Sequence, residues 1–168
     1  MKNDTFKKSQ KRSAFPMTDL TSFVEKFLFE FGDLTIEDAG KLEETIDEKK
    51  AEDFTFSVRD VTRLLEQYVQ IPELKIIYPI SRYGEFPDIT VSYDISNGTT
   101  LERILQSIND FYQQPLVPSN VDAYIAENEF YSFLNNETQP RLIDVMVGLT
   151  RIEGLQETPN GFKLQLGS

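Results

Sequence analysis

The spacing of apolar residues changes along this chain, and that change limits the fold more than any other feature. From residue 20 to about residue 70 the apolar residues recur every three or four positions, as on one face of a helix. They alternate with polar residues over 89–95, return to helical spacing over 101–134, and alternate again at the end. This order predicts an α+β fold: a single domain with a mostly antiparallel sheet of about four or five strands, covered by amphipathic helices.

The first helical segment has the clearest pattern. Thr18 suits its N-cap, Gly32 its end, and its apolar face comprises Leu20, Phe23, Val24, Phe27, Leu28 and Phe31. A thinner helix is predicted after Thr35. Three later helix starts show the spacing of a capping box: Ser57 with Asp60, Thr99 with Glu102, and Ser119 with Asp122.

The strands are predicted from three stretches. "ELKIIYPI" (73–80) and "PDITVSYDI" (87–95) form a hairpin around Gly84, and "SNG" (96–98) ends its second strand. "RLIDVMVGL" (141–149) is nearly continuously apolar, which is typical of a central strand. "RIEGLQETPNGFKLQL" (151–166) predicts a second hairpin turning at Pro-Asn-Gly, with Gly154 marking a bulge or a close backbone approach.

The composition restricts the chemistry that the chain could perform. The sequence contains no Cys and no His. A cysteine nucleophile, a Ser-His-Asp triad and the common thiolate or imidazole metal sites therefore cannot be built from this chain alone. An enzyme would have to use carboxylates, and we single out Asp88, Asp94, Asp144 and Glu153. We expect no cofactor.

Charge is distributed unevenly. Residues 1–12 carry a net charge of +4, whereas the rest of the chain holds 12 basic and 27 acidic residues, a net of −15. We expect residues 1–16 to be a disordered basic arm and residues 17–168 to be the folded domain. Nucleic acid or an import receptor could contact only the arm, through Lys7, Lys8, Lys11 and Arg12, because phosphate binding requires positive potential.

An acidic cluster and an excess of aromatic residues suggest contacts with other proteins. Glu43, Glu44, Asp47 and Glu48 form a candidate docking surface for a basic partner, although a solvated helix face would have the same pattern. The chain has 13 Phe and seven Tyr. We expect most of them in the core, with an exposed aromatic patch for a protein partner as the alternative, and base stacking is disfavoured by the acidic surroundings.

The C-terminal half resembles a group of viral proteins. "GTTLERILQSINDFYQQPL", followed by "RLIDVMVG", "IEGL" and "GFKLQLGS", resembles uncharacterised proteins encoded by large nucleocytoplasmic DNA viruses. In that pattern a Thr-led helix ending in Phe-Tyr precedes a C-terminal strand pair with Glu-Gly in its first strand. The resemblance implies a viral origin and an intracellular or virion setting, and it carries over no catalytic residue.

These observations favour a non-catalytic protein-interaction or structural module that binds a protein partner or itself. The alternatives are a small carboxylate-based hydrolase, which could be metal-dependent, and nucleic-acid contact through the basic arm. The sequence begins without the apolar run of a secretory signal, and no stretch approaches the roughly 20 apolar residues of a membrane span. We therefore expect an intracellular protein that is neither secreted nor embedded in a membrane.

Overall fold

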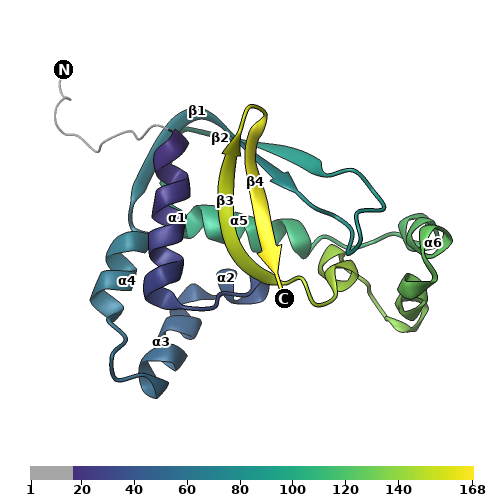
Figure 1. Ribbon diagram of the computed structural model, residues 1–168, viewed down its shortest axis with the longest axis horizontal. Helices are drawn as coiled ribbons and strands as arrows, with labels where there is room; N and C mark the ends of the chain where they lie inside the picture. The colour runs from purple at the N-terminus through teal and green to yellow at the C-terminus, as the bar shows by residue number, and fades with distance from the viewer. Residues whose placement is uncertain (1–16) are drawn as a thin grey trace.

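A computed structural model describes residues 17–168 and confirms the predicted α+β fold of a single domain. The elements follow the predicted order of helices, strands, helices and strands (Figure 1). They are α1 (Met17–Phe31), α2 (Ile36–Ala39), α3 (Leu42–Glu52), α4 (Val58–Leu65), β1 (Tyr68–Tyr78), β2 (Ile89–Thr100), α5 (Leu101–Tyr112), α6 (Pro118–Glu127), the 3-10 helices η2 (Glu129–Asn136) and η3 (Leu142–Met146), β3 (Arg151–Thr158) and β4 (Gly161–Gly167).

The sheet consists of two hairpins joined side by side. Its strand order is β2-β1-β4-β3, so the later hairpin docks through β4 onto β1. Both hairpins are antiparallel, and the contact between β1 and β4 is parallel, with Ile76 opposite Phe162. This arrangement leaves β2 and β3 as the two edge strands.

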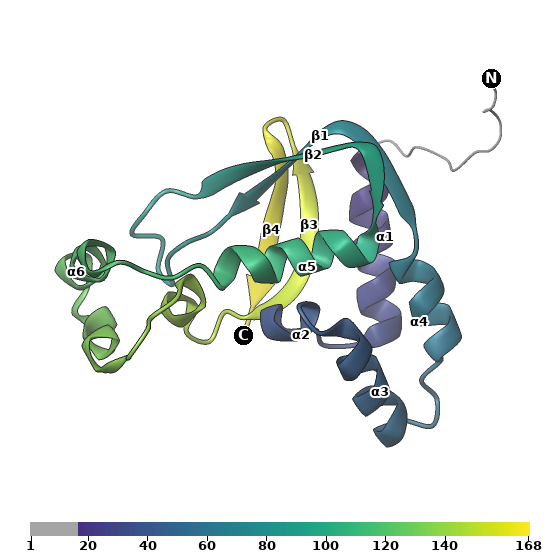
Figure 2. The same cartoon turned by 180° about the vertical axis from the view of Figure 1, so that it is seen from behind.

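Two helices form most of the core with the sheet. Figure 2 shows α5 crossing one face of the sheet, and α1 lies along β3 in both views. The apolar face predicted for α1 is confirmed, because four of its six members are buried and Phe23 and Leu28 pack partly buried against them. Gly32 ends α1 with a φ of +96°, a left-handed conformation that glycine adopts without a steric cost.

The C-terminal hairpin is confirmed in detail. Thr158 pairs with Gly161 around the two-residue turn Pro159–Asn160, and the register shifts between Ile152 and Gly154, as the predicted bulge requires. Phe162 and Leu164 of β4 are fully buried. The hairpin is therefore part of the core.

The strand predicted over residues 141–149 is wrong. Residues 142–146 form the 3-10 helix η3, and its four apolar residues are all buried. The carboxylate of Asp144 accepts a hydrogen bond from the backbone N–H of Arg141 at 2.7 Å. A short acidic side chain that bonds nearby backbone favours such a turn over a strand. Asp144 is thus a local capping group and does not lie on the sheet.

The first hairpin is longer than predicted, because irregularities replace the expected breaks. β1 begins at Tyr68, and Pro72 lies where the register shifts between Ile71 and Leu74. "SNG" does not end β2: residues 96–98 form a bulge, with Gly98 at φ +87°. A proline or glycine inside a strand is tolerated at such a bulge.

Helix starts were predicted with mixed success. The side chains of Thr35 and Ser57 accept the expected hydrogen bonds from the N–H groups of Asp38 and Asp60. The cap of α5 is Thr100, one residue after the predicted Thr99. The predicted Ser119 cap is wrong, because α6 begins at Pro118, which suits the first turn of a helix.

Candidate functional site

The two edge strands of the sheet differ in what lies beside them. At the β3 edge, the backbone N–H of Ile152 donates to the carbonyl of Leu34, and that of Ile36 donates to the carbonyl of Thr150, both at 2.8 Å. β2 pairs with β1 along one side, and no other strand within residues 17–168 pairs with its second side. The second side of β2 therefore offers backbone donors and acceptors to another chain.

One face of β2 borders a groove above α5. Ile89, Val91 and Tyr93 line a hollow of about 450 Å³ together with Ser107, Asp110, Phe111, Gln114 and Leu142. An adjoining hollow of about 390 Å³ shares Tyr93 and Ser107 and extends along Ile95, Thr99, Arg103 and Ile104. We call the two hollows together the β2–α5 groove. Its apolar members are only partly covered, since Ile89 is 42% exposed.

Aromatic side chains fix the floor of this groove. The rings of Tyr78 and Phe111 stack with centroids 3.9 Å apart, and the hydroxyls of Tyr78 and Tyr93 are hydrogen-bonded at 2.7 Å. Burial raises the pKa of both tyrosines above the ordinary value, so the pair is neutral near pH 7. The groove therefore has a rigid, uncharged centre.

Charged side chains mark the two ends of the groove. Asp94 and Arg103 line one hollow, and Asp110 lines the other. Hydrogen bonds from the hydroxyl and the backbone N–H of Ser96 lower the pKa of Asp94, which keeps it anionic. The guanidinium of Arg103 donates to Gln106 at 3.3 Å. Within residues 17–168, neither Arg103 nor Asp110 forms an ion pair.

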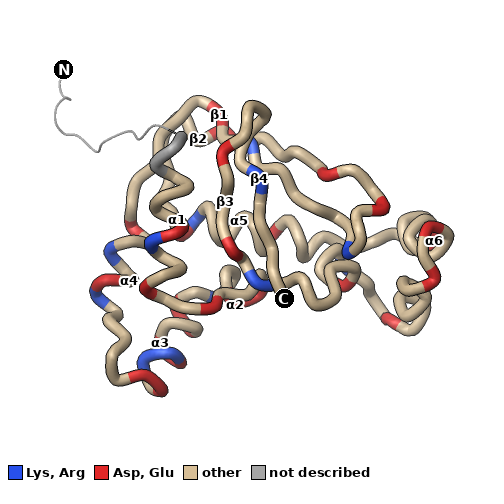
Figure 3. Tube along the Cα trace, in the orientation of Figure 1, with Lys and Arg blue, Asp and Glu red and all other residues tan. Residues whose placement is uncertain are grey.

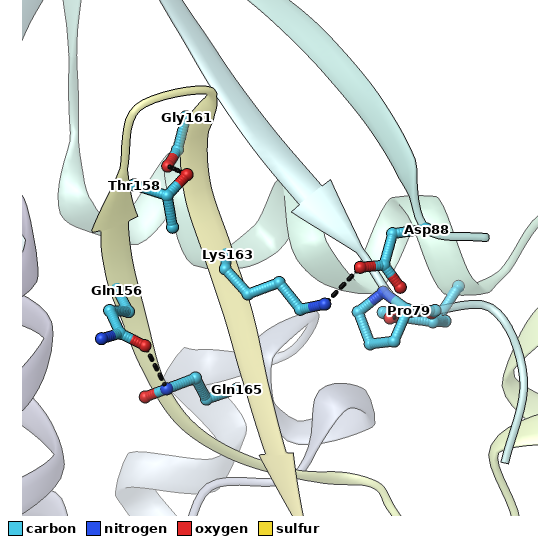
Figure 4. A network of polar contacts seen from close by, with 8 residues as sticks. Pro79, Asp88, Gln156, Thr158, Gly161, Lys163 and Gln165 are labelled. Carbon is cyan, nitrogen blue, oxygen red and sulfur yellow. Dashed lines mark hydrogen bonds and ion pairs between the residues drawn. The ribbon is translucent and has the colours of Figure 1, made fainter. Parts of the chain in front are cut away.

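The four carboxylates considered for catalysis each have a partner of their own. Asp88 pairs with Lys163 across the sheet surface (Figure 4). Asp94 is held by Ser96, and Glu153 forms an ion pair with Arg151 at 2.6 Å. Asp144 caps η3. Each partner accounts for its carboxylate structurally, which is the ordinary role of such groups.

Asp144 does share a hollow with a second acid. Glu37, Arg141 and Asp144 line a space of about 340 Å³ with Thr35, Ile143 and Thr150. The carboxylate of Asp144 is already bonded to the backbone N–H of Arg141 and lies 4.0 Å from its guanidinium. Within residues 17–168, no three acidic side chains gather in a way that could hold a metal ion.

The predicted acidic surface is exposed on α3. Glu43, Glu44, Asp47 and Glu48 all face solvent, while Leu42, Thr45 and Ile46 face the protein. None of the four forms an ion pair with another described residue. Figure 3 shows acidic and basic residues side by side on α3, which lies at the lower edge of the view, whereas β2 runs along the upper edge. The predicted contacts of Lys7, Lys8, Lys11 and Arg12 lie outside the described residues.

The aromatic candidates are mostly core residues. Phe111 and Tyr112 are buried, so they present no face on which a base could stack. Tyr124 and Tyr131 are buried as well, whereas Phe130 and Tyr83 remain exposed and meet edge-to-face with centroids 5.2 Å apart. In this exposed aromatic pair, Phe130 belongs to the lobe formed by α6 and η2, and Tyr83 belongs to the loop between β1 and β2.

Sequence reasoning missed Glu85, which joins that lobe to the loop between β1 and β2. Its carboxylate accepts hydrogen bonds from the Tyr131 hydroxyl at 2.9 Å and the Asn128 amide at 2.8 Å. Partial desolvation acts to raise the pKa of Glu85, but these hydrogen bonds outweigh it and lower the pKa. Its partners lie more than 40 residues away, so no local signal could have identified it.

Comparisons with protein-family models, with curated proteins and with solved structures found no match to this chain. Among the helices of residues 17–168, none combines the length and the apolar character needed to cross a membrane.

Proposed function

We propose that this protein is a non-catalytic protein-interaction module whose binding surface is the second side of β2 together with the β2–α5 groove. The observation that carries the proposal is the unpaired side of a 12-residue edge strand beside a partly exposed apolar groove. An added strand would bond to the backbone of β2, and its alternate side chains would enter the groove.

The composition of β2 supports this use of its edge. Proteins usually protect an exposed edge with lysine, proline or several charges. Residues 89–100 contain no Lys, Arg or Pro and one charged residue, Asp94. The other edge strand, β3, carries Arg151, Glu153 and Glu157. The unprotected edge is therefore the one beside the groove.

The proposed setting is intracellular, in a host cytoplasm or a virion. It rests on the resemblance of the C-terminal half to giant-virus proteins and on the absence of Cys, which suits a reducing compartment. Mass spectrometry of purified virions from the source of this chain would test the virion assignment, and absence from both virions and infected cells would contradict it.

The binding surface can be tested with peptides. A library of extended peptides of eight to ten residues would be screened against the protein, and binding would be mapped by amide chemical shifts. We expect the largest changes at residues 89–95, with loss of binding in Thr90→Lys, whose position is exposed on β2.

A matched control distinguishes this surface from the acidic face of α3. Gln156→Lys places the same charge at an exposed position of the other edge strand, β3, and should leave binding intact. Basic peptides could instead change the amide chemical shifts of residues 43–48 and bind Thr90→Lys as tightly as the wild type. That result would favour the α3 surface and contradict the β2 proposal.

A further inference from the structure

The stretch of β2 that is free to pair has a defined length and centre. β2 runs from Ile89 to Ile95 without an extra residue, and the bulge at residues 96–98 then interrupts it. The midpoint of these seven residues is Ser92, which is exposed. A strand of seven residues extends about 23 Å, enough for a full set of pairing bonds with another strand.

This stretch is complementary to itself when it is turned around Ser92. In an antiparallel pair centred there, Ile89 lies opposite Ile95, and Val91 lies opposite Tyr93. Asp94 lies opposite Thr90, so no like charges meet. Centring the pair on Val91 would set Asp94 against Asp88, and centring it on Tyr93 would set Ile89 against Asn97. The Ser92 register alone of these three keeps every apolar residue opposite another.

The charges of α5 follow the same symmetry. Arg103 and Asp110 are exposed and stand about 10.5 Å apart along the helix. Ser107, close to their midpoint, lines the same two hollows as Tyr93. Because α5 runs back along β2, a two-fold axis near Ser92 would bring Arg103 of one copy beside Asp110 of the other. Neither forms an ion pair within residues 17–168 of one copy.

We infer that the occupant of the β2–α5 groove is a second copy of this chain, which pairs β2 with β2 around Ser92 to form a continuous eight-stranded sheet. This inference rests on the proposed function, because it names the partner for the same surface. The acidic α3 lies at the lower edge of both views and β2 runs along the upper edge, so α3 would stay away from the contact between the two copies (Figures 1 and 2).

The test measures the mass of the full chain in solution by sedimentation velocity at increasing concentration. We expect the wild type to form a dimer. Ser92→Lys would set two ammonium groups against each other at the axis and should raise the dissociation constant at least about tenfold. The control Gln156→Lys, on the other edge strand, should leave the dimer unchanged.

A charge swap tests the geometry independently. Arg103→Asp and Asp110→Arg each place like charges across the proposed axis, and each should weaken the dimer. The double variant Arg103→Asp/Asp110→Arg restores both pairs by symmetry and should recover the dimer. Circular dichroism would confirm that these exposed substitutions leave the fold intact.

The possible results test the identity of the partner separately from the location of the binding surface. A chain that stays monomeric at every concentration overturns the inference that the partner is a second copy. A dimer whose dissociation constant is changed neither by Ser92→Lys nor by the charge swap overturns it as well. A monomer that still binds peptides at residues 89–95 keeps the proposed function. A monomer that dimerises only after removal of residues 1–16 would assign the groove to that segment and also overturn the inference.

Discussion

The two edges of the sheet were built from similar strands but have different surroundings. β3 carries three charged residues, and its first residues bond to the segment that follows α1. β2 carries one charge, and its second side pairs with no strand among residues 17–168. Both strands also contain a bulge with a glycine, at Gly154 and at Gly98.

An edge strand can be protected from pairing with another chain in two ways: by its own charged side chains and by neighbouring backbone that the tertiary structure places beside it. β3 has both kinds of protection, charged side chains and neighbouring backbone. Along residues 89–95, β2 has one charged side chain, Asp94, and no neighbouring strand on its second side among residues 17–168, while Ile89, Val91 and Tyr93 line the groove. A weakly charged edge with no neighbouring strand is expected to be used for binding or to aggregate, and β2 is the edge with these properties.

Removing β4 should reduce the stability of the protein more than any other change considered. Truncation before Phe162 deletes β4, which joins β1 to β3 and buries Phe162 and Leu164. We expect the loss of cooperative thermal unfolding, measured by circular dichroism. An unchanged unfolding transition would show that the C-terminal hairpin contributes little to the core.

The hydrogen bond between the Tyr78 and Tyr93 hydroxyls should contribute more to stability than an exposed hydroxyl bond in the same hairpin. Tyr93→Phe removes the partner of the buried Tyr78 hydroxyl, and an unpaired buried hydroxyl costs about 1–3 kcal/mol. Tyr68→Phe is the control, since its hydroxyl bonds to Asn97 at an exposed position and should cost less. Urea titration would measure both, and equal losses would contradict the prediction.

The two bulges should respond differently to alanine. Gly98 has a φ of +87°, and an added Cβ would lie 1.9 Å from the Tyr68 hydroxyl oxygen. Gly98→Ala should therefore destabilise the protein by about 1–2 kcal/mol from backbone strain alone. Gly154→Ala meets its nearest atom at 3.4 Å without a left-handed backbone and should change stability by less than about 0.5 kcal/mol.

The smallest expected effect is a pH dependence in the loop that joins β1 to β2. The pKa of Glu85 is lowered in the folded protein, so its contribution to stability is present above pH 4.5 and is lost as the pH falls through the lowered pKa. Glu85→Gln should flatten the fall in melting temperature between about pH 5 and pH 3. A slope in Glu85→Gln equal to that of the wild type would contradict the prediction.

Local patterns were sufficient where a structure is determined by residues near one another. The stripe of α1, the Ser57 cap and the Pro-Asn-Gly hairpin each depend on contacts within one helix or one turn, and each was confirmed. The pattern failed at residues 142–146, because a continuous apolar run buries equally well in a strand or a compact helix. The hydrogen bond that the Asp144 carboxylate accepts from the backbone N–H of Arg141 favours the helix there.

By itself, the sequence determined the fold class, the order of the elements and the exclusion of histidine and cysteine chemistry, since these follow from residue types and their spacing. Only the tertiary structure decided which strands became edges, that Glu85 binds a lobe more than 40 residues away, and that Tyr93 and Ser107 meet in one groove. The physical reason is that the pairing of strands and the packing of helices on a sheet depend on contacts between distant residues, which no local spacing records.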